Sequence, residues 1–178
     1  MLEKLREIEK DHLWRLLCDT GHVEWRGLLV DYHHPYVWRL WTQFDEDHRV
    51  FLHKIHPCEP GEALLHPHPW PSAMRVFTPE GTSYETGTAY AWPGTAAKPV
   101  CGGTFYLQTG SCYEMVKDFA WHYVRPIGGP IYSLMVVGRP YKAPKQERFG
   151  QNRVHKPIDA DQVGDLLAFF RKTYAPPA

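Results

Sequence analysis

The stretch Leu64-Leu65-His66-Pro67-His68-Pro69-Trp70 places two imidazoles two residues apart, in a segment that reads as strand and turn rather than helix. Side chains of a β-strand alternate between two faces, so His66 and His68 share one face if the segment is extended. Two imidazoles on one face supply part of a metal site, and a third ligand must come from elsewhere in the chain. Pro67 and Pro69 cannot donate hydrogen bonds within a sheet, so we expect a bulge or a strand break beside them. The stretch therefore predicts a short strand lining a barrel that holds one metal ion.

The third imidazole of this predicted site is His122. It lies in the run Phe119-Ala120-Trp121-His122-Tyr123-Val124, where Ala120 and Val124 would share its face and leave room for an ion and a ligand. Three imidazoles leave coordination positions open, which is typical of catalytic metal sites rather than structural ones. The alternatives are histidines exposed in a proline-rich loop for the pair and a core histidine bonded to a carbonyl for His122.

A carboxylate would complete this ligand set. Ser72 and Ala73 stand where a glutamate on the same strand would be expected, so that ligand is absent. Glu85, on the following predicted strand, is the best substitute as a metal ligand or general base, and Glu80 and Glu114 are weaker candidates. The alternative for Glu85 is a solvated carboxylate on a strand.

The rest of the chain predicts an all-β domain. Aromatic residues make up 14% of the chain and there are 16 prolines, a composition that favours short strands separated by turns. Regularly spaced short strands are typical of a sandwich or barrel. The predicted strands cover 23–31, 36–44, 49–55, 63–68, 70–77, 83–92, 103–108, 112–116, 119–124 and 131–137.

Apolar residues spaced by three and four predict amphipathic helices over 2–18 and 159–174. We expect the 178 residues to form a single domain. Its parts would be an N-terminal helix in 1–20, a β-barrel in 23–140, and an arm with a C-terminal helix in 141–178.

Charge and cysteine content narrow the partners. The 20 basic and 20 acidic residues balance, and no clustered Lys and Arg favour nucleic acid or an anionic membrane as a partner. The basic segment 139–156 is compatible with an anion site, but a solvated tail is its default interpretation. The four cysteines show no C-x-x-C spacing and there is no apolar run of membrane-spanning length or signal peptide, so we expect a soluble cytoplasmic protein with reduced thiols.

Further side chains are candidates for a second metal site or for contact with a substrate. A second metal site of the form H-x-x-H-x-C at His53, His56 and Cys58 is disfavoured, because residues 53 and 56 would lie on opposite faces of a strand. Five side chains are candidate substrate contacts, with packing or surface roles as the default: Arg39, Tyr84, Tyr90, Arg125 and Tyr132.

Two blocks of this sequence resemble the two motifs of the cupin superfamily. The first block runs from Val50 to Ile55, through the 64–70 stretch, to Gly81-Thr82-Ser83-Tyr84-Glu85, and is similar to small bacterial and phage cupins with an H-x-H-P-W motif. The second runs from Trp121 to Pro126 and from Gly129 to Gly138. The resemblance covers about 35–140 and implies a double-stranded β-helix (jelly-roll) barrel.

The resemblance also implies a divalent metal held by two or three histidines and often one glutamate. Carried over to this chain, His66, His68 and His122 match metal ligands and Glu85 matches tentatively. The chain departs from the pattern by lacking a glutamate soon after the H-x-H pair, which puts four-ligand coordination in doubt. Cupins include dioxygenases, isomerases, lyases and binding proteins, so the resemblance does not select a reaction.

Three functional hypotheses follow. The favoured one is a mononuclear metalloenzyme acting on a small organic molecule, with Fe(II) and dioxygenase chemistry suited to three imidazoles. If Glu85 coordinates, an isomerase or lyase with Zn, Mn or Ni becomes more attractive, and Glu85 or Tyr84 would move protons. The alternatives outside catalysis are a cupin that binds a small ligand and a homodimer paired through exposed edge strands.

Overall fold

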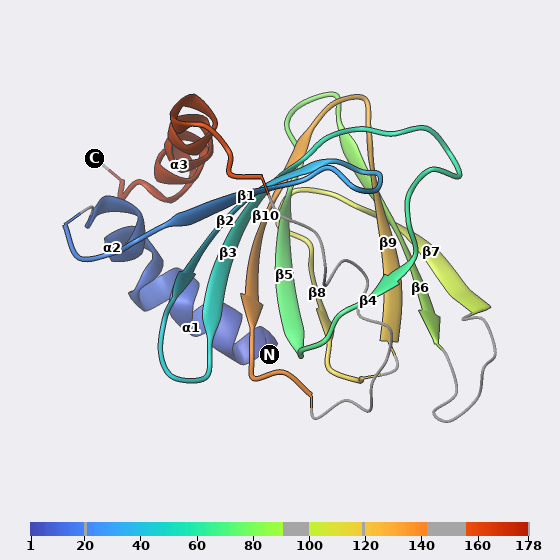
Figure 1. Ribbon diagram of the computed structural model, residues 1–178, viewed down its shortest axis with the longest axis horizontal. Helices are drawn as coiled ribbons and strands as arrows, with labels where there is room; N and C mark the ends of the chain where they lie inside the picture. The colour runs from blue at the N-terminus through green and yellow to red at the C-terminus, as the bar shows by residue number, and fades with distance from the viewer. Residues whose placement is uncertain (20, 91–99, 119, 142–155, 178) are drawn as a thin grey trace.

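The computed structural model describes residues 1–19, 21–90, 100–118, 120–141 and 156–177 (Figure 1). Within these ranges the chain forms ten strands flanked by helices at both ends, as the sequence pattern predicts. The elements are α1 (Leu2–Asp11), α2 (Leu13–Cys18), β1 (Arg26–Val30), β2 (Val37–Gln43), β3 (Arg49–Ile55), β4 (His66–Pro67), β5 (Ser72–Phe77), β6 (Ser83–Tyr90), β7 (Val100–Leu107), β8 (Cys112–Met115), β9 (Ala120–Ile127), β10 (Ile131–Val137) and α3 (Ala160–Tyr174).

The strands form two sheets that face each other. One sheet has the order β1-β2-β3-β10-β5-β8 and the other the order β4-β9-β6-β7. All strand pairs within both sheets are antiparallel. The eight strands from β3 to β10 are distributed between the sheets in the order of a jelly roll, with β6 and β7 paired as neighbours in one sheet, and β1 and β2 extend the other sheet beyond β3. This strand order confirms the all-β, cupin-like jelly-roll fold with flanking helices.

The helices cover the outer face of the six-stranded sheet (Figure 1). Leu40, Leu52 and Leu134, from three adjacent strands, are fully buried there in one cluster with Leu5 of α1 and Phe170 of α3. Burying a leucine side chain stabilises the fold by about 2 kcal/mol relative to leaving it exposed. This face is therefore a conventional hydrophobic core.

The N-terminal helix differs from its prediction, because the structure divides 2–18 into two helices. The division is at His12, whose φ of −131° departs from helical geometry. Leu5 and Ile8 of α1 and Leu13 and Leu17 of α2 are all buried in the cluster over the sheet. The apolar spacing found in the sequence is thus used, but by two short helices that change direction to follow the sheet.

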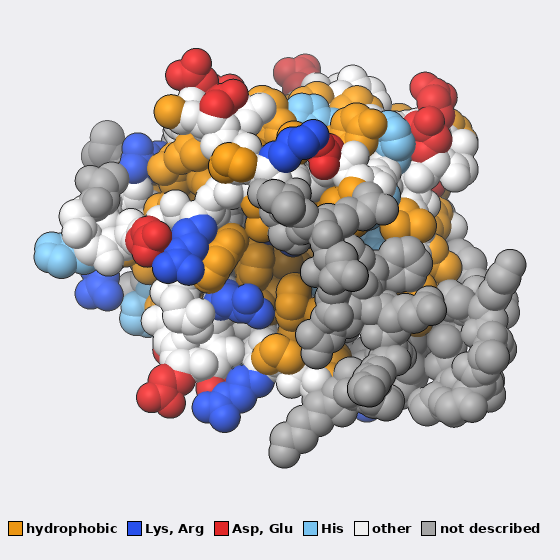
Figure 2. All heavy atoms as spheres, in the orientation of Figure 1, with side chains coloured by type: hydrophobic (Ala, Val, Ile, Leu, Met, Phe, Trp, Pro, Cys, Tyr) orange, Lys and Arg blue, Asp and Glu red, His pale blue; other side chains and the backbone are white. Residues whose placement is uncertain are grey.

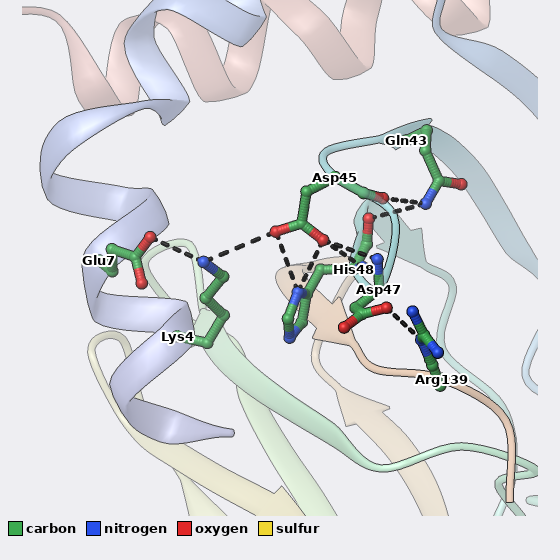
Figure 3. Close-up of polar contacts among 7 residues, drawn as sticks. All are labelled: Lys4, Glu7, Gln43, Asp45, Asp47, His48 and Arg139. Carbon is green, nitrogen blue, oxygen red and sulfur yellow. Dashed lines mark hydrogen bonds and ion pairs between the residues drawn. The ribbon is translucent and has the colours of Figure 1, made fainter.

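The turn between β2 and β3 anchors both α1 and the residues after β10 (Figure 3). The carboxylate of Asp45 accepts hydrogen bonds from the backbone N–H groups of Asp47 and His48, each at 2.8 Å. Lys4 of α1 lies 3.7 Å from Asp45, and Arg139 pairs with Asp47. These contacts hold the end of the hairpin against the N-terminal helix.

Charged side chains of both signs are interspersed over the described part of the face in Figure 2. None of the described helices is long and apolar enough to cross a membrane. Most of the predicted basic arm, residues 142–155, lies outside the described residues, as does Trp92 at the end of a predicted strand. The arm's role and the extent of the domain remain predictions.

Candidate metal centre

The three predicted histidines converge on one point between the sheets. His66 on β4 lies directly opposite His122 on β9, and His68 follows His66 after the intervening proline. One ligand nitrogen from each of the three rings lies within 4.8 Å of the others. The Nε2 atoms of His68 and His122 are 2.9 Å apart. The parity argument for two residues on one face thus brings the rings together, at an edge strand where prolines are tolerated.

Each of the three rings has a protein partner on its Nδ1 atom. A histidine that binds a metal through one nitrogen usually uses the other for a hydrogen bond that fixes the ring. The Nδ1–H of His66 donates to a backbone carbonyl, which leaves its Nε2 lone pair free. The Nδ1 partners are Leu64 O for His66 (2.9 Å), Ser72 Oγ for His68 (3.4 Å) and Tyr113 Oη for His122 (3.4 Å).

The spacing of the rings fits a shared ion. With metal–nitrogen bonds of about 2.1 Å, two imidazoles at right angles would place their nitrogens about 3 Å apart. The separation of 2.9 Å between His68 and His122 matches this value. Two neutral rings joined by a hydrogen bond would show the same separation, which is the arrangement expected without an ion.

The environment keeps all three rings neutral. Burial, opposed by the hydrogen bond to Leu64, lowers the pKa of His66 to about 4. Burial, reinforced by the neighbouring imidazoles, lowers the pKa of His68 and His122 well below the ordinary value. Because only a neutral imidazole can offer a lone pair, the ligand set is ready for a cation near neutral pH.

The rings open into a cavity of about 270 Å³ between the two sheets. Its size is at the small end of the range for small-molecule sites. Apolar and aromatic side chains form most of its wall. The described polar or ionisable residues that line it are Tyr32, His33, Arg39, His53, His66, His68, Trp70, Tyr84, His122 and Ser133.

Tyr84, a predicted catalytic residue, lies in this cavity. Its side chain is 1% exposed, and its hydroxyl is 2.9 Å from that of Tyr113, which in turn is 3.4 Å from His122 Nδ1. Burial raises the pKa of Tyr84 and of Tyr113 above the ordinary value, so both hydroxyls hold their protons. A chain of hydroxyls therefore connects the cavity wall to one ring of the histidine cluster.

Glu85 lies away from the cluster. Neighbouring residues on β6 face opposite sides, and Glu85 lies on the outer side, directly across from Arg125. Arg125 donates two hydrogen bonds to its carboxylate, at 2.6 and 3.1 Å, and the Tyr123 hydroxyl donates another at 3.1 Å. These bonds, chiefly those from Arg125, lower the pKa of Glu85. The structure thus supplies Glu85 with a partner of opposite charge on the far side of the sheet from the histidines.

Of the candidate substrate contacts, some line the cavity and others lie away from it. Arg39 and Tyr84 line the cavity, whereas Arg125 pairs with Glu85 on the outer side. Tyr132 stacks on Phe169 of α3, with ring centroids 3.6 Å apart. The side chain of Tyr90 lies outside the described residues.

Sequence reasoning does not place three further residues at this site: His53 and Ser133, which line the cavity, and Tyr113, which lies behind Tyr84. The sequence suggests His53 only for a disfavoured metal site with His56 and Cys58. Tyr113 links Tyr84 to His122. The available signal for His53 was its place in a strand whose alternate residues Val50 and Leu52 belong to the opposite, helix-covered face.

Comparisons with known proteins give structural neighbours only. No family model matches the chain, and no curated protein matches it. Among solved structures, the chain is similar to hydroxypropylphosphonic acid epoxidase from S. wedmorenis, with 16% identity, a TM-score of 0.46, and coverage of 64% of this chain and 55% of that one. The chain thus spans just over half of that protein's length.

Two shorter neighbours are covered over most of their own length. KdgF from Halomonas sp. has 12% identity, a TM-score of 0.41, and coverage of 64% of this chain and 88% of that one. An RmlC-like cupin from Shewanella frigidimarina has 11% identity, a TM-score of 0.41, and coverage of 69% of this chain and 88% of that one. At such similarity the fold assignment rests on the strand order of the two sheets.

Proposed function

We propose that this chain is a cupin-type enzyme that uses one divalent metal ion, held by His66, His68 and His122, to act on a small organic molecule. The observation that carries the proposal is the convergence of three neutral imidazoles, each with its Nδ1 atom engaged by the protein, at the wall of the cavity between the two sheets. Within this class we favour Fe(II) and a dioxygenase reaction, because three histidines leave open positions and no carboxylate joins them among the described residues.

A ferrous ion at this site would supply binding of dioxygen and redox chemistry. The chain's own contribution is to orient the substrate, to keep it in a mostly apolar cavity, and to hold protons. Tyr84 lines this cavity with its hydroxyl protonated and 2.9 Å from that of Tyr113, and we assign it the role of hydrogen-bond donor to the bound substrate. Glu85 has no part in this proposal, since it lies on the outer side of its sheet.

A second candidate is a cupin that binds a small ligand without catalysis. One observation favours it: no Asp or Glu is found among the described residues that line the cavity, so no carboxylate base faces a bound ligand. The isomerase or lyase alternative depended on Glu85 as ligand or base and loses that support. Pairing of two copies through an edge strand stays a prediction.

The test is metal content followed by oxygen consumption. The full chain, purified without a histidine tag, would be reconstituted anaerobically with Fe(II) and compared with the His66→Ala/His68→Ala double variant and with Glu85→Gln as the matched control. We expect about one iron per chain in the wild type and in Glu85→Gln, and an affinity reduced by more than about 100-fold in the double variant.

Oxygen uptake would then be measured with small thiols and aromatic diols. Uptake that depends on both iron and substrate supports the dioxygenase. Stoichiometric Zn, Mn or Ni with no uptake would shift the assignment to other metal chemistry, and absence of any metal after reconstitution would leave the binding protein.

A further inference from the structure

A row of three polar side chains crosses the inner face of the six-stranded sheet. Arg39 of β2 lies directly opposite His53 of β3, and His53 lies directly opposite Ser133 of β10. His53 is 4% and Ser133 1% exposed, and all three residues line the same cavity as the histidine cluster. The row is thus part of the cavity wall, in register across three strands.

The hydrogen bonds in this row fix the state of each member. Arg39 Nε donates to His53 Nε2 at 3.1 Å, so this nitrogen must be an acceptor without a proton. The proton of the neutral ring is then on Nδ1, which lies 3.0 Å from Ser133 Oγ and donates to it. His53 therefore orients the guanidinium of Arg39 without neutralising its charge.

The charge of Arg39 has no counter-charge in the described structure. No described Asp or Glu forms an ion pair with it, and none lines the cavity. Arg75 and Arg125, by contrast, each pair with a carboxylate. Arg39 is half-buried with its guanidinium 5.6 Å from the centre of the Phe51 ring, and a ligand carboxylate would supply the counter-charge that the described residues do not.

Trp70 contributes a donor in the cavity wall that has no acceptor among the described residues. The Nε1 atom of Trp70 is buried and has no hydrogen-bond partner among the described residues, and Trp70 lines the cavity. Buried indole N–H groups usually find an acceptor. A guanidinium without a counter-charge and an indole N–H without an acceptor, in a cavity whose described lining has no carboxylate, point to a ligand that brings acceptor oxygens.

We propose that Arg39, oriented by His53 and Ser133, binds a carboxylate of the substrate and so holds the organic remainder against the histidine cluster. This inference rests on the proposed function for the reaction that follows, but the anion site itself needs no metal. A guanidinium presents paired N–H groups that match the two oxygens of a carboxylate. A monoanion suits the site better than a phosphate dianion, because Arg39 is the sole formally charged residue among the described cavity residues.

The test is calorimetric binding of propionate and benzoate to the full chain, with propionamide and benzamide as neutral isosteres and inorganic phosphate as the competing anion. Each would be titrated into the metal-free and the zinc-loaded protein. Arg39→Met removes the charge and keeps an unbranched apolar side chain, and Arg39→Lys keeps the charge without the planar fork. Arg49→Met is the matched control, because Arg49 is on the neighbouring strand, stacked 4.9 Å from the ring of Trp70, and is not among the residues lining the cavity.

We expect a carboxylate to bind the metal-free wild type about 10- to 100-fold more tightly than its amide, and Arg39→Met to lose that difference. Arg39→Lys should lose part of it, and Arg49→Met should stay within about twofold of wild type. If Arg39→Met does not fold, as judged by circular dichroism and cooperative unfolding, the result for Arg39→Lys decides.

Four results would overturn the proposal: equal binding of amide and carboxylate, equal losses in Arg39→Met and Arg49→Met, tighter binding of phosphate than of either carboxylate, or no carboxylate binding at millimolar concentration. Zinc stoichiometry separates this failure from that of the metal centre. Binding of zinc but not of carboxylate would support the metal centre and refute the anion site. Binding of carboxylate but not of zinc would support the anion site and refute the metal centre.

Discussion

The two faces of the six-stranded sheet use the same strands for opposite purposes. On the outer face, Leu40, Leu52 and Leu134 lie under α1 and α3 and are fully buried. One residue away on each strand, Arg39, His53 and Ser133 form the hydrogen-bonded row in the cavity. Strand alternation therefore separates an apolar face that packs under the helices from a polar face that lines the cavity.

This difference teaches how the fold tolerates a polar interior. The jelly-roll interior holds a histidine cluster, an arginine and several hydroxyls, whose desolvation costs free energy. The helix-covered face provides an apolar core outside the space between the sheets. The predictions below test whether the two faces are separable.

The largest effect on stability is expected on the outer face. Leu134→Ala removes a fully buried side chain and should lower the free energy of unfolding by about 2–5 kcal/mol. Ser133→Ala, one residue away on the inner face, should cost only about 1 kcal/mol for the lost hydrogen bond. Urea unfolding of metal-free protein measures both, and a larger cost for Ser133→Ala would break the comparison.

Two Tyr→Phe substitutions, one on each face of the six-stranded sheet, test whether only the inner face affects zinc affinity. Tyr113→Phe removes the hydroxyl beside His122 Nδ1 and should weaken zinc binding by about tenfold. Tyr132→Phe removes a hydroxyl from the helix-covered side, where the ring stacks on Phe169, and should leave zinc affinity unchanged. Competition with a chelator measures both affinities, and equal losses would show that the faces are coupled.

The inner face should also give the metal-free protein a pH-dependent stability. Burial, followed by the charge of Arg39, lowers the pKa of His53 well below 6.5. Near and below pH 6.5 the unfolded chain therefore binds a proton at this ring that the folded chain does not bind. Unfolding free energy then rises with pH in this region and falls as the pH drops below about 6.5, by up to about 1.4 kcal/mol per pH unit for each such group.

Replacing His53 should reduce this slope. His53→Gln keeps an acceptor for Arg39 without a titrating ring. Its slope of unfolding free energy against pH should be smaller than that of wild type by a difference that grows toward one proton as the pH falls from about 7 to about 5.5. Leu134→Ala should lower stability equally at both pH values. An unchanged slope in His53→Gln would show that His53 is not held neutral by the fold.

The smallest effect on metal binding is expected at Glu85. Glu85→Gln weakens a largely buried pair with Arg125 on the outer side of the four-stranded sheet and should lower the free energy of unfolding by about 1–3 kcal/mol. Metal content should not change. A loss of metal in a folded Glu85→Gln variant would restore the carboxylate to the site and contradict the placement described above.

The sequence predicts those parts of the fold that depend on short, local patterns of residues. Short runs rich in apolar and aromatic residues, separated by turn residues, located all ten strands, and His66 and His68 lie in one histidine cluster. The division of the N-terminal helix at His12 was missed, because apolar spacing continues across it.

The parts of the site that depend on pairing between distant strands could not be predicted. Whether Tyr84 or Glu85 faces His122 depends on the register of β6 against β9, which no local pattern specifies. The Arg39–His53–Ser133 row requires β10 to pair with β3 across 80 residues of sequence. A charged or polar residue at the inward position of a strand is visible in sequence, but its partners are not.

The most direct test of the central claim is X-ray absorption spectroscopy of the protein loaded with one equivalent of zinc or iron. The account predicts three imidazole nitrogens at about 2.0–2.2 Å, with the same spectrum in Glu85→Gln and a loss of imidazole scattering in His122→Ala. A first coordination sphere with fewer than two imidazoles, or one that changes in Glu85→Gln and not in His122→Ala, would contradict it.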